Sequence, residues 1–236
     1  MLTTFALVAL AVFDAPTKVE TKDLGANRTL TCWRYPHVLV KQIDAHEKGA
    51  ARLSFVHFDG AAPACEEPLA PTEKVLTDWS GYYAGAFGAL VIFDADDGWN
   101  GGMGFAVYDA TTGTQVFKDA RFGELTSSKG TLLYKRLVPL DCNASKDKTC
   151  AARAMTLAST KQDLGSLCRN GYTKWLADFQ KQVAKLPCDG ECKQDRKEQL
   201  DSFRASNSVL VYEVSVDATT FAITPKTKQP ECWLQN

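Results

Sequence analysis

The segment Val107-Tyr-Asp-Ala-Thr-Thr-Gly-Thr-Gln-Val-Phe117 is the clearest hairpin signal in this sequence. Two runs of β-prone residues flank a polar turn, in which Gly113 can adopt the positive φ that a tight turn needs. A β-propeller would repeat such a unit about four or more times at a fixed period. Similar segments recur in the sequence only in weak form and at irregular spacings. The sequence therefore predicts an antiparallel sheet and argues against a propeller.

Strand-like runs continue on both sides of the hairpin, from about residue 28 to residue 138. They are rich in Val, Phe, Tyr, Leu and Thr and are separated by Gly, Pro and Asp, which is typical of β-structure. Both faces of the run Arg52–Phe58 are largely apolar, which predicts a strand covered on two sides. The expected strands are 29–33, 37–43, 52–58, 88–93, 105–108, 114–118, 131–138 and 208–216, with 221–224 as the hairpin partner of the last.

The periodicity changes after Cys142. Between residues 172 and 186 apolar residues recur at helical spacing, and Pro187 and Gly190 mark the end of that helix. Two more helices are expected at 149–159 and 191–204. The apolar stripe of the central helix consists of Tyr172, Trp175, Leu176, Phe179, Val183 and Leu186.

These patterns together predict the fold class and the domain organisation. We expect an α+β protein, mainly an antiparallel β-sheet or sandwich, with a disulfide-stapled helical insertion near the C-terminal third. Residues 16–236 are expected to form a single exported β-rich domain, and the helical insert covers about 145–206.

Residues 1–15 are expected to be a signal peptide. The nine residues Phe5–Phe13 are all apolar, too short a run for a membrane span but suited to the core of a signal peptide. Ala9-Leu-Ala11 offers a cleavage site, and a position near Ala15 offers a second. No basic residue precedes Lys18, so either the signal peptide is incomplete or the run is a buried segment of the fold.

The sequence contains 8 cysteines, all downstream of that segment. An even number of cysteines beside an export signal is typical of disulfide-bonded proteins that are secreted or periplasmic. Zinc binding is the alternative, because the short spacing of Cys188 and Cys192 resembles a metal-ligand pair. No Cys-x-x-Cys occurs and the 3 histidines lie far upstream, so disulfides are favoured. Proximity in the sequence pairs Cys32 with Cys65, Cys142 with Cys150, Cys188 with Cys192, and Cys168 with Cys232.

Composition excludes several classes of protein. A chain of 236 residues with 45% hydrophobic residues can bury a substantial core. Its 27 basic and 28 acidic residues nearly cancel, which argues against a nucleic-acid partner. No run of about 18 apolar residues is present, so we expect no transmembrane segment.

The stretch Asp94-Ala-Asp-Asp-Gly-Trp-Asn100 gathers hard oxygen ligands. The side chains of Asp94, Asp96, Asp97 and Asn100 offer the donors that calcium prefers, and backbone carbonyls and water would complete its shell. The positions of glycine and glutamate do not match the helix-loop-helix calcium signature. The alternative is a long polar hairpin loop in which Asp and Gly only form turns. Calcium is the one cofactor that the sequence suggests.

Aromatic residues and glycines are interleaved in one stretch, 78–105. Seven of the 16 glycines fall there, and clustered glycines indicate bulges or the close approach of another backbone or a ligand. The rings of Trp79, Tyr82, Tyr83 and Trp99 could stack on a sugar or pack against a partner protein. The alternative is that these rings are part of the core.

No motif in the sequence nominates a catalytic site. The Gly-x-Ser-x-Gly motif, a phosphate-binding Gly-x-x-x-x-Gly-Lys loop and a dinucleotide fingerprint are absent. We therefore expect a non-catalytic binding or interaction module whose partner is an extracytoplasmic protein or glycan. The alternative is an extracytoplasmic hydrolase that uses the acidic segment 94–100 as a metal or acid/base site.

Overall fold

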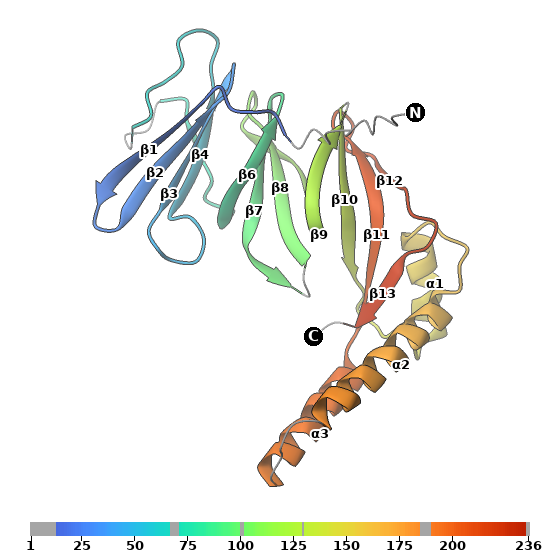
Figure 1. Cartoon of the computed structure of the whole chain (residues 1–236). Coiled ribbons are helices and arrows are strands. Elements are labelled where there is room, and N and C mark those ends of the chain that lie inside the picture. Colours follow the sequence, from blue (N-terminus) through green and yellow to red (C-terminus); the bar gives the residue numbers. More distant parts are fainter. Residues whose placement is uncertain (1–12, 67–70, 100–101, 129, 185–189, 235–236) are drawn as a thin grey trace, which may run out of the picture. The chain divides into compact units, whose positions relative to one another are not determined.

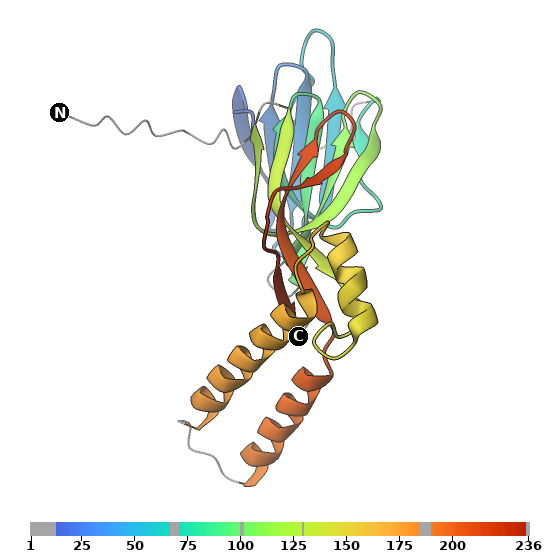
Figure 2. The same ribbon diagram turned by 90° about the vertical axis from the view of Figure 1, so that its right-hand side faces the viewer.

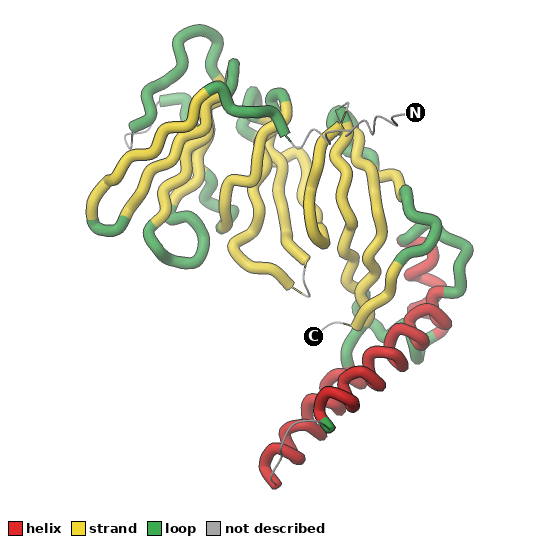
Figure 3. The backbone as a smooth tube through the Cα atoms, viewed as in Figure 1, coloured by secondary structure: helices red, strands yellow, loops and turns green. Residues whose placement is uncertain are grey.

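The computed structural model describes residues 13–66, 71–99, 102–128, 130–184 and 190–234 (Figure 1). The chain divides into two units, one holding the residues up to 133 together with 216–222, the other holding 134–215 and the residues from 223. Most strands are antiparallel, and the helices follow one another between residues 148 and 205 (Figure 3). The expected fold class is therefore confirmed: an antiparallel β-protein with a helical part late in the chain.

The first unit begins with an antiparallel meander. Each strand pairs with the next one in the chain, in the order β1-β2-β3-β4-β5. Residue pairs such as Cys32 with Lys41, and Lys41 with Ser54, lie opposite each other across β2, β3 and β4. The strands are β1 (Lys18–Gly25), β2 (Arg28–Arg34), β3 (Val38–Asp44), β4 (Arg52–His57) and the two-residue β5 (Lys74–Val75).

A second run of antiparallel strands completes the first unit. These strands are β6 (Gly81–Phe87), β7 (Leu90–Trp99), β8 (Gly102–Asp109) and β9 (Thr114–Ser128), each paired with its neighbour in the chain. The turn between β8 and β9 is the expected hairpin, since Asp109 accepts a hydrogen bond from the Thr111 amide at 2.7 Å and Gly113 has φ +69°. An aspartate that bonds an amide two residues later is typical of such turns.

Alternation along the strands builds the core between the two sheets of the first unit. One face of β3 and β4 presents Val38, Val40, Leu53 and Phe55, which pack with residues of β6, β7 and β8. The rings of Phe55 and Phe93 lie 6.2 Å apart at their centroids. Successive side chains of a strand point to opposite faces, so every second residue of these runs enters the core.

The other face of β3 and β4 is buried as well, as predicted for the run 52–58. A second cluster forms there from Leu30, Cys32, Leu39, Ile43, Val56 and Cys65. The segment after β4, called here the strap (residues 58–73), covers this face; its residues 67–70 are outside the described part of the chain. The covering explains why β3 carries almost no exposed residue.

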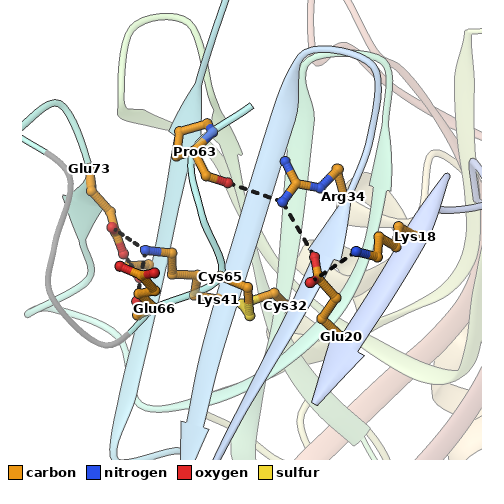
Figure 4. Close-up of a disulfide and its surroundings, with 10 residues drawn as sticks. Lys18, Glu20, Cys32, Arg34, Lys41, Pro63, Cys65, Glu66 and Glu73 are labelled. Atoms are coloured by element: carbon orange, nitrogen blue, oxygen red, sulfur yellow. Dashed lines mark hydrogen bonds and ion pairs between the residues drawn. A yellow bond between two sulfur atoms is a disulfide. The ribbon is translucent and has the colours of Figure 1, made fainter. Parts of the chain in front are cut away.

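Polar contacts and a disulfide hold the strap on the sheet (Figure 4). Cys65 is bonded to Cys32 of β2, and Arg34 donates to the Pro63 carbonyl at 3.0 Å. Lys41 donates to the Glu66 carbonyl at 3.1 Å. These bonds satisfy polar groups that would otherwise be buried without partners.

The second unit combines strands and helices. Its sheet has the order β12-β11-β10, and β13 also pairs with β11. The Tyr212 hydroxyl of β11 donates to the Leu157 carbonyl at the end of α1, 3.1 Å away. The elements are β10 (Thr131–Pro139), α1 (Lys148–Leu157), α2 (Leu164–Val183), α3 (Gly190–Ala205), β11 (Ser208–Asp217), β12 (Ile223–Pro225) and β13 (Glu231–Leu234).

Three of the four expected disulfide pairings are confirmed. Cys32 is bonded to Cys65, Cys142 to Cys150, and Cys168 to Cys232. Cys192 is disulfide-bonded too, while Cys188, its expected partner, lies outside the described residues. The bond from Cys168 joins α2 to β13, and the bond from Cys142 fastens the start of α1. The helical part is therefore stapled, as the fold-class prediction stated.

Two predicted boundaries were wrong for identifiable reasons. Helix α2 starts at Leu164 rather than 172, because Asp163 caps it and Leu164 and Cys168 are buried, although no aromatic stripe marks this first part. Strand β1 was missed, since the first expected strand began at residue 29. It is an edge strand whose side chains are mostly exposed, and charged residues are common there.

Two other features bear on the predictions for the chain's ends and for membranes. Asp14 is docked on β6, since its amide donates to the Ala86 carbonyl at 2.9 Å and its carboxylate accepts from the Gly88 amide at 2.7 Å. Within the described residues, no helix is long and apolar enough to cross a membrane. Residues 1–12, where most of the expected signal peptide falls, lie outside the described part of the chain.

Candidate functional site

The acidic segment forms the end of strand β7 up to Trp99, so the alternative of a long polar loop was wrong. Here Asp94 pairs with Phe105 of β8, and the register shifts before Gly98. Glycine close to a strand end lets the backbone approach its neighbour closely. The segment remains on the strand because Asp96 also receives a main-chain bond: its amide donates to the Ser80 carbonyl at 3.3 Å.

Each described carboxylate of this segment has a protein partner. Two side-chain nitrogens of Arg121, on β9, donate hydrogen bonds to the two carboxylate oxygens of Asp94, at 3.2 Å and 2.6 Å. The Ser80 hydroxyl donates to Asp96 at 3.0 Å. Lys48 forms an exposed ion pair with Asp97 at 2.5 Å, and its hydrogen bond lowers the pKa of that carboxyl.

These pairings bear on the calcium hypothesis and on the hydrolase alternative. Asn100, the fourth expected ligand, lies outside the described residues. In the part of the chain that is described, no cluster of three or more His, Cys, Asp or Glu side chains could hold a metal ion. Calcium would have to displace Lys48 and Arg121 from their carboxylates to use Asp94 and Asp97. Calcium binding and an acid/base role therefore stay predictions, with no support from these contacts.

Trp79 and Tyr82 lie near this strand end but are engaged differently. Trp79 is half-buried, donates to the Asp94 carbonyl at 3.1 Å and has the Lys118 ammonium 5.2 Å from its ring centroid. Tyr82 is 37% exposed, and its hydroxyl accepts from the Gly49 amide at 2.8 Å. The face of the Trp79 ring thus already holds a cation, whereas part of the Tyr82 ring remains open to solvent.

Tyr83 faces the core, because neighbours on a strand point to opposite sides. Its ring lies 4.6 Å from that of Trp33, and its hydroxyl is 2.5 Å from that of Tyr35. Burial and the bond to Tyr35 raise the pKa of Tyr83. The side chain of Trp99 lies outside the described residues, although its backbone belongs to β7. The four expected ligand-binding rings therefore do not form one surface, and their role stays untested.

A larger aromatic surface lies on helix α2. The first turns of α2 are anchored, since Leu164 and Cys168 are buried. Beyond Cys168 no described side chain of α2 is buried, and its apolar stripe is only half-covered. The described side chains of the stripe are Tyr172, Trp175, Leu176 and Phe179, with the rings of Trp175 and Phe179 stacked at 5.0 Å. The side chain of Val183 and residue Leu186, also predicted for the stripe, lie outside the described part of the chain.

Helix α3 follows α2 in the chain and runs beside it (Figures 1 and 2). Its half-buried residues recur every four positions, at Cys192, Arg196 and Leu200, as expected for one side of a helix. No described side chain of α3 is fully buried. We call the α2 stripe the hairpin seam. The sequence predicted the stripe from its period, but how far other elements cover it depends on the fold.

Comparison with protein-family models, with curated proteins and with solved structures found no match for this chain. The assignment of function therefore rests on the residues and contacts described above.

Proposed function

We propose that this chain is an exported binding protein without catalytic activity, and that it binds another protein through the hairpin α2–α3. The observation that supports the proposal is the hairpin seam, whose large apolar side chains lie on one side of α2 and are only partly buried. Contiguous apolar surface that remains open on a folded protein is characteristic of interaction sites.

The partner that fits the seam is an amphipathic helix. Residues 172, 175, 176 and 179 form ridges one helical turn apart, and such ridges pack into the grooves of a second helix. Charge does not favour a strongly acidic or basic partner, because α3 carries as many basic as acidic residues. Affinity would therefore come from apolar burial, with the mixed charges forming the rim.

The base of the hairpin is fixed, which favours binding. The Cys168–Cys232 disulfide joins α2 to β13, and the Asp163 side chain caps the helix by accepting from the Ser166 amide at 3.1 Å. Strands and a covalent bond thus set the direction in which α2 projects. A preorganised element loses less conformational entropy when its partner docks.

Export is the compartment that the disulfides support. Disulfides persist in oxidising environments and are rare in reducing ones, so we place the protein outside the cytoplasm, secreted or periplasmic. We further propose that the signal peptide is cleaved after Ala11. Cleavage after Ala15 would remove Asp14 and with it the two hydrogen bonds that Asp14 forms with Ala86 and Gly88.

Site-specific photo-cross-linking tests the proposed interaction. A benzophenone amino acid is introduced at Thr173, which is exposed beside the seam, and separately at Thr219, an exposed turn residue of the first unit. Exposure to the natural extracellular or periplasmic fluid should give one cross-linked protein from Thr173 and none from Thr219. The cross-linked peptide should be an amphipathic helix, and a synthetic copy of it should bind the unmodified protein.

Matched variants separate the seam from the rest of the hairpin. Leu176→Glu with Phe179→Glu should weaken peptide binding by about tenfold or more, since charge enters the apolar contact. Ala177→Glu with Gln180→Glu places the same charges at the same spacing on exposed positions and should leave binding unchanged. Circular dichroism confirms that both variants fold. Equal binding by the two variants, or cross-links only to a second copy of this chain, would overturn the proposal.

A further inference from the structure

A hollow in the second unit is lined by lysines and is separate from the hairpin seam. Its volume is about 560 Å³, within the range of small-molecule sites. One wall is strand β11 and another is the connection from β12 to β13. The lining residues are Lys135, Val211, Tyr212, Glu213, Lys226, Thr227, Lys228, Gln229 and Glu231.

The charges of the hollow are unevenly paired. Lys135 forms an ion pair with Glu231 at 3.4 Å. Among the described residues, the ammonium groups of Lys226 and Lys228 have no ion-pair partner. Glu213 is the remaining carboxylate of the lining. The hollow therefore holds an excess of positive charge, with two ammonium groups available to an incoming anion.

Two hydrogen bonds hold the chain at Lys226 and Thr227 against the sheet. The Lys226 amide donates to the Glu213 carbonyl at 2.8 Å. The Glu213 amide donates in turn to the Thr227 hydroxyl at 3.0 Å. Residues 226 and 227 are thus both bonded to Glu213 of β11, so the backbone that carries Lys226 is positioned before any ligand arrives. A backbone that is already positioned loses less conformational entropy when a ligand binds.

We propose that this hollow binds a small molecule that carries oxyanion groups: carboxylate, phosphate or sulfate. Lys226 and Lys228 provide charge-assisted hydrogen bonds, and the Gln229 amide adds a neutral donor. Lys135 takes part by exchanging Glu231 for the ligand. The observations that support this anion site do not involve the hairpin α2–α3. The proposed anion site is therefore independent of the proposed binding function.

Titration with three probes tests the proposal and distinguishes the sources of the oxyanion. Inorganic phosphate, sulfate and citrate are each added to the uniformly ¹⁵N-labelled full-length protein at constant ionic strength. Saturable shifts should appear at the amides of residues 226–229 and 211–213. The probe with the lowest dissociation constant identifies phosphate, sulfate or carboxylate as the preferred group.

Charge variants decide whether the site is specific. Lys226→Gln with Lys228→Gln should weaken binding about tenfold or more, because both free ammonium groups are lost. Glu213→Gln should tighten binding severalfold, since it removes the carboxylate that repels the ligand. Lys161→Gln changes an exposed lysine outside the hollow and should have no effect. Absence of saturation, or equal weakening by Lys161→Gln, would refute a built site.

Discussion

The most unusual single contact in the first unit is a buried ion pair. The Lys41 ammonium lies 2.8 Å from a Glu73 oxygen, with the two side chains only 3% and 0% exposed. Ser54 donates to the other Glu73 oxygen at 2.5 Å. Burying a charge is costly unless it is paired and hydrogen-bonded, and here both conditions are met. The contact joins β3 and β4 to the strap that covers them.

Glu73→Gln should strongly destabilise the first unit. The substitution leaves the Lys41 charge buried without its counter-ion, which costs about 3–5 kcal/mol in comparable pairs. The measurement is urea denaturation of the oxidised protein. As a matched control, Asp97→Asn also converts the carboxylate of a lysine pair to an amide, but the Lys48–Asp97 pair is 61% and 68% exposed, so no measurable loss is expected. Similar losses in both variants would contradict the argument.

At the scale of one element, helix α2 depends on its first turn. Asp163 precedes the helix, and its carboxylate accepts from the Ser166 hydroxyl at 2.6 Å and from the Ser166 amide at 3.1 Å. These bonds lower the pKa of Asp163. An ionised cap satisfies main-chain donors that no earlier carbonyl of the helix can reach.

The cap predicts a defined pH dependence. A carboxyl whose pKa is lowered by folding stabilises the native state above its unfolded pKa, near about 4, and this contribution is lost as the pH falls through the folded pKa. Asp163→Ala should therefore be less stable than the natural protein at about pH 7, and the difference should shrink at about pH 2. Asp163→Asn, which caps as well but does not titrate, should stay close to the natural protein at neutral pH. Urea midpoints measured at both pH values check this; a difference that is independent of pH would disprove it.

Strand β6 shows at the same scale why the candidate site was only partly predictable. The interleaved aromatic residues and glycines of 78–105 led us to predict both Tyr82 and Tyr83 as ligand-binding rings. Alternation along the strand instead sends Tyr83 into the core and leaves Tyr82 at the surface. The glycines of this stretch were interpreted correctly as points of close approach, since Gly81 lies directly against the Asp94 carbonyl. Sequence alone did not show which face of β6 is buried.

At the scale of the whole molecule, disulfides connect elements that are distant in the sequence. Cys168 and Cys232 are 64 residues apart, whereas Cys142 and Cys150 are 8 apart. Both bonds belong to the second unit, which holds the strands β10 to β13 and the three described helices. Closing a longer loop removes more entropy from the unfolded chain, so the two bonds should stabilise this unit to different degrees.

Removing the long-range bond should cost more than removing the local one. The chain-entropy relation gives about 4 kcal/mol for Cys168→Ala with Cys232→Ala and about 2.5 kcal/mol for Cys142→Ala with Cys150→Ala. Guanidinium denaturation of the two double variants measures the difference. A larger loss from the local bond would show that packing around α1, rather than loop closure, determines the contribution of these bonds.

The sequence by itself determined the fold class, most strands of the first unit, the helical region and three disulfide pairings. These features depend on local periodicity and on distance along the chain, both of which can be read from neighbouring residues. The tertiary structure alone decided which residues are exposed and which charges meet. Asp94 forms an ion pair with Arg121 of β9, Lys41 forms one with Glu73 of the strap, and the α2 stripe is only partly buried. Burial and ion pairing depend on segments that the fold brings together from distant positions, so no local pattern specifies them.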